Sequence, residues 1–346
     1  MRLSKSPALI LLKASSLFGL FLFLTASGVL VSVVRAQDVE DVVRTDISVV
    51  KLNIGVVDRR GNPITTLRQG DFAIFEDGVK QSILHFEPTE SPFSLVLLLD
   101  TSGSTISFRQ QLKQAAWRFL DALGPQDRVA VIQFNSRIKL LSDFSTNRRR
   151  TAYAIELAEG AGATHFYEAL DFSLKALEKE GQRRKAIVVL TDGLDTQLRN
   201  VDRTAVINAE TDEQAIAAVD PAASSTLNAV LSAADRQGVT IYPLALPSGD
   251  PKRLPLPDPV ITGIYSAART RLQTLADRTG GRLSEINRLD QMARLYAEVA
   301  ADLRTLYTVT YQARGERPRA GKWHEIRVEV SQPELIARTR PGYYSR

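Results

Sequence analysis

The chain has 346 residues, 44% of them hydrophobic and 24% charged, so it can bury at least one large core and is neither a low-complexity nor a repeat protein. Four of its 44 basic residues and none of its 39 acidic residues lie in residues 1–36, so the remainder is close to neutral. That balance, with no aromatic residues among the short basic runs, argues against nucleic-acid binding. Cysteine is absent, which excludes disulfides, thiol catalysis and thiolate metal sites.

Residues 1–36 have the pattern of an export signal. Arg2, Lys5 and Lys13 precede or open an apolar stretch that runs to Val34, and small residues at Val34 and Ala36 match the positions that a signal peptidase recognises. We expect cleavage after Ala36 and a periplasmic or extracellular location for the rest of the chain. An uncleaved membrane anchor is the alternative, because the stretch approaches the roughly 20 residues that span a bilayer.

Residues 37–91 form a predicted N-terminal β segment. A β-branched run over 47–57 is followed by a turn over 58–63, and alternating residues at 72–75 and 82–86 flank the hairpin signal Glu76-Asp77-Gly78. These strands are too few to be stable alone.

Residues 92–304 alternate between strand and helix patterns. This alternation predicts an α/β domain with a doubly wound, mainly parallel sheet. The expected strands cover 95–99, 129–134, 138–144, 185–190 and 239–246, and the expected helices cover 108–123, 148–158, 166–180, 271–277 and 290–304. Residues 197–225 and the proline-rich residues 248–266 are expected to be surface excursions from that sheet.

Residues 305–346 return to a β pattern. Alternating residues over 307–312, 323–330 and 335–339 predict antiparallel strands. Because both ends of the chain are rich in strands, we expect the C-terminal segment to pair with residues 37–91 in one β-sandwich-like unit, with the α/β domain inserted between them.

Oxygen-bearing side chains follow the first strand of the predicted parallel sheet. Asp100, Ser102 and Ser104 come directly after the apolar run, and Gly103 allows a tight turn. Ligands of open α/β sheets bind beyond the carboxyl ends of the strands, where this loop emerges. A carboxylate with two hydroxyls suits Mg²⁺, Mn²⁺ or Ca²⁺ better than zinc.

Two further loops are expected at the same edge of the sheet. Thr191-Asp192-Gly193 follows another buried strand, and Thr164 lies on a glycine-rich turn before a helix. We therefore expect Asp100, Ser102, Ser104, Thr164 and Asp192 to surround one cation. Taken singly, the serines and Thr164 could be helix caps and Thr191-Asp192-Gly193 a turn, but this leaves their common placement at strand ends unexplained.

These three segments, including Tyr167-Glu-Ala-Leu170 after Thr164, resemble the metal-ion-dependent adhesion site of the von Willebrand factor type A domain family. The resemblance covers about residues 93–303, and the flanks are similar to an exported bacterial subgroup. It implies that Asp100, Ser102, Ser104 and Thr164 hold the ion directly or nearly so, and that Asp192 contacts it directly or through water. Ala163 departs from the glycine common in the family. Asp195 is either a support of this site or an ordinary loop aspartate.

The expected function is that of an exported adhesion module, not an enzyme. Two carboxylates and neutral hydroxyls leave a divalent ion, Mg²⁺ first among the candidates, open to the Asp or Glu carboxylate of a partner protein. Two alternatives stay open. One is a metal-assisted hydrolase with His165 as base, and the other is an envelope assembly protein that does not use the ion.

Overall fold

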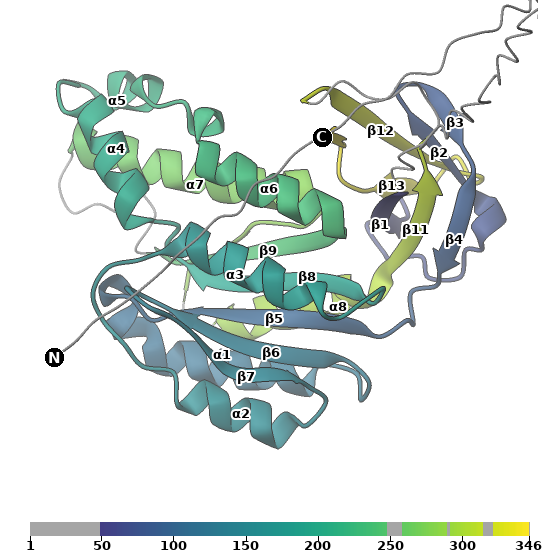
Figure 1. The fold of residues 1–346 in the computed structure, drawn as a ribbon, viewed down its shortest axis with the longest axis horizontal. Coiled ribbons are helices and arrows are strands. Elements are labelled where there is room, and N and C mark those ends of the chain that lie inside the picture. Colours follow the sequence, from purple (N-terminus) through teal and green to yellow (C-terminus); the bar gives the residue numbers. More distant parts are fainter. Residues whose placement is uncertain (1–48, 248–257, 289–290, 314–320, 346) are drawn as a thin grey trace, which may run out of the picture. The chain divides into compact units, whose positions relative to one another are not determined.

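The computed structural model describes residues 49–247, 258–288, 291–313 and 321–345 (Figure 1). The expected export signal over residues 1–36 lies outside these described residues. Within them, no helix combines the length and the apolar character needed to cross a bilayer.

A six-stranded sheet forms the centre of the α/β domain. Its strands, in the order β10-β9-β8-β5-β6-β7, are parallel except for β7, which is antiparallel to β6. The strands are β5 (Phe93–Asp100), β6 (Arg128–Phe134), β7 (Ile138–Ser145), β8 (Arg184–Thr191), β9 (Val239–Ala245) and β10 (Ser284–Glu285). Every residue of β5, β8 and β9 is buried, as expected for parallel strands covered on both faces.

Helices cover the two faces of this sheet in two separate layers (Figure 1). One layer contains α1 (Arg109–Asp121), α2 (Arg148–Glu156) and α8 (Met292–Thr305), which share a core with one side of the strands. The other contains α3 (Phe166–Glu178), α6 (Ser225–Gln237) and α7 (Pro259–Thr279). The predicted doubly wound, mainly parallel architecture is therefore confirmed.

The two flanks pair with each other in two antiparallel sheets. One has the order β13-β1-β11-β4 and the other the order β14-β12-β2-β3. The strands are β1 (Val49–Val57), β2 (Phe72–Glu76), β3 (Val79–Gln81), β4 (Ile83–Glu87), β11 (Leu306–Gln312), β12 (Trp323–Val330), β13 (Ile336–Arg338) and β14 (Gly342–Tyr344). Leu52 and Tyr307 of one sheet share a core with Ile74 and Ile326 of the other, so the expected β-sandwich-like unit is present.

The hairpin between β2 and β3 has the predicted turn. Asp77 and Gly78 both have positive φ, 48° and 79°, which is the backbone that a two-residue hairpin turn requires. The aspartate and glycine in these places are the residues that adopt it with the least strain.

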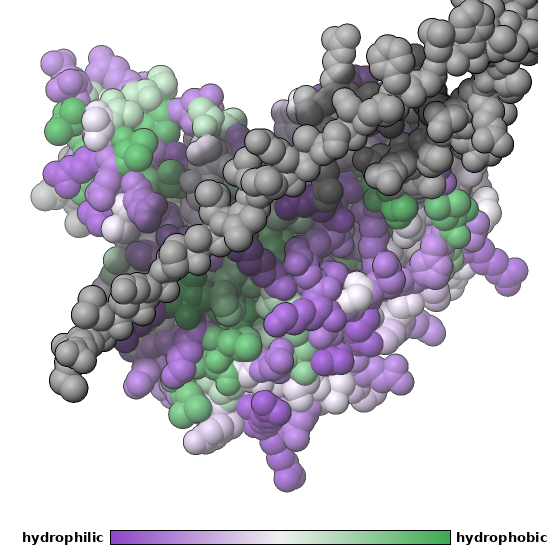
Figure 2. All heavy atoms as spheres, in the orientation of Figure 1, coloured by the Kyte–Doolittle hydropathy of each residue, from purple (hydrophilic) through white to green (hydrophobic). Residues whose placement is uncertain are grey.

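The two expected excursions are more helical than the sequence indicated. Residues 197–225 contain α4 (Thr196–Val206), α5 (Asp212–Ala218) and a short 3₁₀ helix (Pro221–Ala223). Val206 and Ala215 form a small core with Ile264 of α7. Apolar side chains gather over α4 and α5 in Figure 2, and the exposed ones include Val201, Ile207 and Ile216.

The second expected excursion is wrong over residues 259–266, and its residues 248–257 lie outside the described residues. Helix α7 begins at Pro259, so residues 259–266 are helical and the expected helix over 271–277 is only its later part. Asp258 caps this helix by accepting a hydrogen bond from the Ile261 N–H at 3.2 Å, and Pro259 occupies the first helical position, where its missing N–H costs nothing. The proline marks the start of a helix here and not a loop.

Candidate metal centre

The register of the central sheet places two of the predicted loops side by side. Leu99 of β5 lies opposite Leu190 of β8, so Asp100 and Thr191 leave the same edge at the same level. The chain proceeds from β5 to β6 on one side and from β8 to β9 on the other. This is a switch point of the strand order, where open α/β sheets bind ligands.

Asp100 is the buried base of this site, with 1% of its surface exposed. Its Oδ1 accepts the backbone N–H of Ser102 at 3.0 Å, and its Oδ2 accepts the hydroxyl of Thr191 at 2.8 Å. The hydroxyl oxygens of Ser102 and Ser104 lie 3.2 Å apart. The first loop therefore turns its three oxygen-bearing side chains toward one region.

Asp192 adds a second carboxylate with no exposed surface. Its Oδ1 accepts the Leu194 N–H at 3.1 Å, whereas its Oδ2 is buried without a hydrogen-bond partner among the described residues. An unpartnered buried carboxylate oxygen costs free energy, which a cation would recover.

The two carboxylates influence each other's ionisation. Burial raises the pKa of Asp100 to about 7, and the negative charge of Asp192 adds to this rise. Burial also raises the pKa of Asp192, although the Ser104 hydroxyl beside it acts in the opposite direction. Two acids that resist ionisation together in a dry site are what a divalent cation would stabilise in the charged form.

The loop that carries Thr164 touches the first loop. Gly103 donates its N–H to the carbonyl of Gly162 at 3.2 Å, and Gly162 has φ of 94°, a conformation that favours glycine. The Thr164 carbonyl accepts the Thr196 N–H at 2.9 Å, and the Thr196 hydroxyl accepts the Thr164 N–H at 2.9 Å. The Thr164 hydroxyl forms no hydrogen bond with another described residue, so it is free to act as a ligand.

Asp195 positions the loops. One carboxylate oxygen accepts the Phe166 N–H at 2.9 Å at the start of α3, and the other accepts the N–H groups of Gln197 and Leu198 at 2.9 and 3.2 Å at the start of α4. One side chain thus caps two helices and fixes the segment before α3 that holds Thr164. Of the two readings of Asp195, the supporting role fits these bonds.

Two polar residues near the site have no marker in the local sequence. Thr191 was part of the predicted turn, but its bond to Asp100 depends on the register of β5 and β8. Asn135 follows β6 and reads as a turn residue. Its side-chain amide nitrogen donates to the Thr101 hydroxyl at 3.1 Å, and its backbone carbonyl accepts the His165 N–H at 3.1 Å. Asn135 therefore connects the first loop to the loop before α3.

The donor set fits a hard divalent cation. In the part of the chain that the structure describes, no three His, Cys, Asp or Glu side chains come together as a metal cluster. The candidate site instead has two carboxylates and hydroxyls. Such oxygens suit Mg²⁺, Mn²⁺ or Ca²⁺. The unpartnered Oδ2 of Asp192 is the strongest indication, because a cation would give this buried oxygen a partner.

The family comparison agrees with this topology. The family model of the von Willebrand factor type A domain matches residues 95–194, which run from β5 through the loop that contains Asp192. The chain therefore contains a von Willebrand factor type A domain, as the sequence motifs indicated.

Among curated proteins, an uncharacterized protein of Synechocystis, sll0103, is 34% identical over 106 residues, which cover 30% of this chain and 25% of that protein. The match thus spans about a quarter of that relative's length.

Solved structures with a similar fold come from several organisms. A von Willebrand factor type A protein from Catenulispora acidiphila is 12% identical with a TM-score of 0.46, and the match covers 87% of this chain and 74% of that one. The corresponding domain of the pilus tip protein Mfa5 from Porphyromonas gingivalis is 13% identical with a TM-score of 0.45, over 61% of this chain and 95% of that one. The mussel byssus protein PTMP1, with a zinc-occupied MIDAS motif, is 13% identical with a TM-score of 0.45, over 66% of this chain and 49% of that one.

Proposed function

We propose that this chain is an exported protein-binding module that captures an acidic group of a partner protein through a divalent metal ion. Asp100, Ser102, Ser104, Thr164 and Asp192 would hold the ion, with Mg²⁺ as the first candidate and Mn²⁺ or Ca²⁺ as others. The observation that carries the proposal is the buried, unpartnered Oδ2 of Asp192 at the same sheet edge as Asp100.

The side chains of the proposed site supply both negative charge and neutral oxygens, and one side of the site stays open. Asp100 and Asp192 supply two negative charges from a buried floor, while the hydroxyls of Ser102, Ser104 and Thr164 add oxygens without charge. The ion, when bound, supplies the positive charge to which a carboxylate of the partner can bind. Because Ser104 is exposed, the partner can approach from the open side of the loop.

Export is part of the proposal because of residues 1–36. Their basic start, apolar stretch and small residues around Ala36 support cleavage and a periplasmic or extracellular location. A partner protein would then be found in the cell envelope or outside the cell.

A capture experiment tests the proposal. The protein is immobilised and exposed to envelope extract in Mg²⁺, in EDTA, and in EDTA followed by Mg²⁺, with Asp100→Ala as the control. We expect partners that are retained only with Mg²⁺ and never by the variant. Capture that is unchanged by EDTA would support the metal-independent assembly role and contradict the proposal.

One observation keeps the hydrolase alternative testable. The Nδ1 atom of His165 lies 3.3 Å from the carboxylate of Glu168, so the ring has an orienting partner at the edge of the site. If the chain only binds, His165→Ala should leave Mg²⁺-dependent capture intact. A hydrolysis of peptide or phosphate esters by the purified protein that disappears in His165→Ala would favour catalysis instead.

A further inference from the structure

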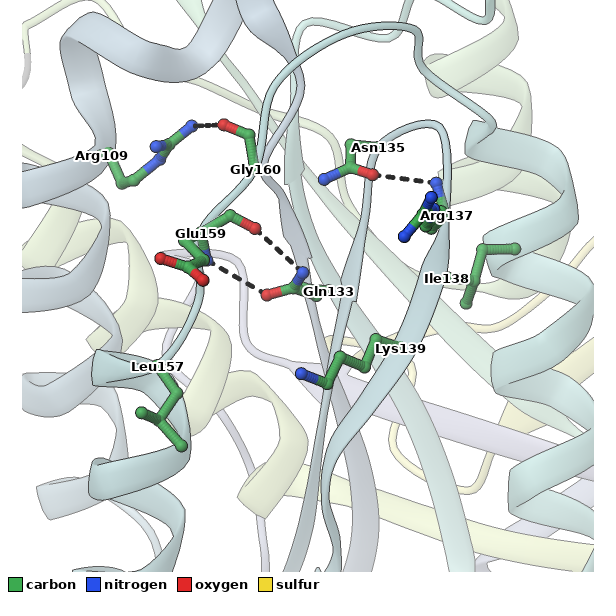
Figure 3. A pocket seen from close by; sticks show the side chains of 9 residues that line it. All are labelled: Arg109, Gln133, Asn135, Arg137, Ile138, Lys139, Leu157, Glu159 and Gly160. Atoms are coloured by element: carbon green, nitrogen blue, oxygen red, sulfur yellow. Dashed lines mark hydrogen bonds between the residues drawn. The ribbon is translucent and has the colours of Figure 1, made fainter.

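A pocket of about 690 Å³ lies beside the metal centre, on the side where β6 turns into β7 (Figure 3). Its lining comes from α1, the β6–β7 turn and the segment that follows α2. The side chains that decide its character are Arg109, Arg137, Lys139, Glu159, Leu157 and Ile138. We call it the basic pocket.

Three cationic side chains line the basic pocket, and none of them forms an ion pair with another described residue. The Arg109 guanidinium donates to the carbonyl oxygens of Gly160 at 2.7 Å and Thr101 at 3.4 Å, which are neutral acceptors. Arg137 and Lys139 are exposed, and neither forms an ion pair with another described residue. Arg137 lies in the turn before β7 and Lys139 lies in β7, and both line the pocket.

The acidic residue of the lining does not cancel this charge. The backbone N–H and carbonyl of Glu159 bond to the side chain of Gln133 at 3.1 and 2.9 Å, and its carboxylate lies on the other side, away from Gln133 (Figure 3). The pocket therefore keeps an excess of positive charge, with three cations against one carboxylate.

The basic pocket and the metal centre share a wall. A Cβ on Gly160 would lie 1.9 Å from the Asn135 amide nitrogen and 2.9 Å from the Thr101 hydroxyl, so the three residues are in direct contact. Thr101 lies in the chain between Asp100 and Ser102. A segment of a partner that reaches the first loop thus also lies next to Arg109 and the β6–β7 turn.

We propose that the basic pocket binds a second acidic side chain of the partner segment whose first carboxylate reaches the metal centre. The ligand is thereby an acidic peptide segment, not an isolated acid. The inference rests on the proposed function. Arg109 offers a guanidinium already fixed by two carbonyls, and charge-assisted bonds to carboxylates are the strong ones. Leu157, which is 49% exposed, and Ile138 give the pocket apolar surface that favours a peptide over a free inorganic anion.

Fluorescence anisotropy with two labelled peptides tests this inference. One is an oligo-glutamate, and the other has a single glutamate among glutamines. We expect the full-length protein with Mg²⁺ to bind oligo-glutamate on the order of ten-fold more tightly, and Arg137→Glu with Lys139→Glu to abolish that difference. Binding of the single-glutamate peptide and of Mg²⁺ should stay unchanged in this double variant, which also shows that it folds.

The matched control is Lys80→Glu with Arg338→Glu, which reverses two exposed charges on the β-sandwich. Equal losses of oligo-glutamate affinity in both double variants would show a general effect of net charge and overturn the inference. Unchanged oligo-glutamate affinity in Arg137→Glu with Lys139→Glu would also overturn it. Binding to anionic lipid vesicles but not to oligo-glutamate, lost in that variant, would assign the pocket to a membrane surface and overturn it too.

The same experiment separates the two proposals. Oligo-glutamate binding that needs Mg²⁺ but ignores Arg137 and Lys139 leaves the metal-mediated function and removes the basic pocket from it. Binding that survives EDTA but is lost in Arg137→Glu with Lys139→Glu supports the pocket and contradicts metal-mediated capture.

Discussion

At the scale of single residues, the proposed metal centre places two carboxylates where burial costs free energy. Asp100 and Asp192 are both buried, and one oxygen of Asp192 has no partner. Buried charges without full compensation destabilise a protein unless something neutralises them. Functional sites commonly carry such a cost.

Asp192→Asn tests this cost directly. The amide removes one buried charge and keeps an oxygen for the Leu194 N–H, so we expect the metal-free variant to be more stable by about 1 to 2 kcal/mol. Mg²⁺ should stabilise the natural protein against denaturant and do nothing for the variant. If the variant is less stable than the natural protein in EDTA, the Asp192 carboxylate stabilises the metal-free fold and the predicted cost is absent.

The raised pKa of Asp100 gives the metal-free protein a pH dependence. Because the folded-state pKa is about 7 and the unfolded value is about 3.9, the folded state binds the proton more tightly. This contribution to the free energy of unfolding is complete below about pH 4 and is lost as the pH rises toward 7. In EDTA the natural protein should lose stability over that window more steeply than Asp192→Asn.

Calorimetric unfolding at several pH values measures how steeply the stability of the natural protein and of Asp192→Asn changes with pH. Saturating Mg²⁺ should oppose the loss, because the ion binds the ionised carboxylates. Equal slopes for the two proteins in EDTA would contradict the coupling between Asp100 and Asp192.

Much of the residue-level site follows from local sequence. Asp100, Ser102, Ser104 and Asp192 stand directly after buried apolar runs, and strand ends meet at one edge of a parallel sheet. The partner of Asp100 at Thr191 depends on strand register, and the roles of Asn135 and Arg109 depend on loops distant in the chain. No local pattern encodes such contacts.

At the scale of elements, hydrogen bonds to the first turns of α3 and α4 fix the loops that carry Thr164 and Asp195. The side chain of Asp195 caps α3 and α4 together, and Thr164 bonds to Thr196 in the first turn of α4. The geometry of the proposed metal centre therefore depends on two helices that do not supply its charges.

Asp195→Ala should remove both caps. We expect a loss of about 2 kcal/mol in the free energy of unfolding, since each cap contributes about 1 kcal/mol, together with weaker Mg²⁺ binding as the Thr164 segment loosens. Asp195→Asn keeps a capping oxygen and should lose much less. Chemical denaturation measures the stability of the three proteins, and calorimetry measures their Mg²⁺ affinity. Equal Mg²⁺ affinity in all three would show that Asp195 does not support the proposed metal site.

The elements that sequence did not reveal share a physical reason. Strands of continuous apolar residues are easy to recognise, whereas α6 directly follows a polar stretch with a short 3₁₀ helix, which conceals its start in the sequence. The start of α7 was placed too late because proline ends a helix in its interior but favours its first turn. Only the Asp258 cap distinguishes these cases.

At the scale of the whole described unit, the β-sandwich contacts the α/β domain through a buried ion cluster. Arg340, which precedes β14, donates to the Asp235 carboxylate at 2.9 Å and to its carbonyl at 3.0 Å, and Arg278 of α7 donates to the same carboxylate at 3.1 Å. Asp235 lies at the end of α6. Pairing of the two flanks of the chain thus also anchors the inserted domain.

Arg340→Ala should leave Asp235 buried with only Arg278. Removing one partner of a buried ion pair costs about 3 kcal/mol, because the remaining charge stays desolvated. Arg338→Ala, on the exposed side of β13, is the control and should change the free energy of unfolding by less than about 0.5 kcal/mol. Equal stability of both variants in denaturant would show that this cluster does not hold the two parts together.

The most direct measurement of the central claim is anomalous diffraction from crystals of the protein grown with Mn²⁺. We predict one peak among the loops after β5 and β8, within coordination distance of Asp100, Thr164 and the Oδ2 of Asp192, and its absence in crystals of Asp100→Ala. A structure in saturating Mn²⁺ with no peak there, or with Thr164 turned away from both carboxylates, would contradict it.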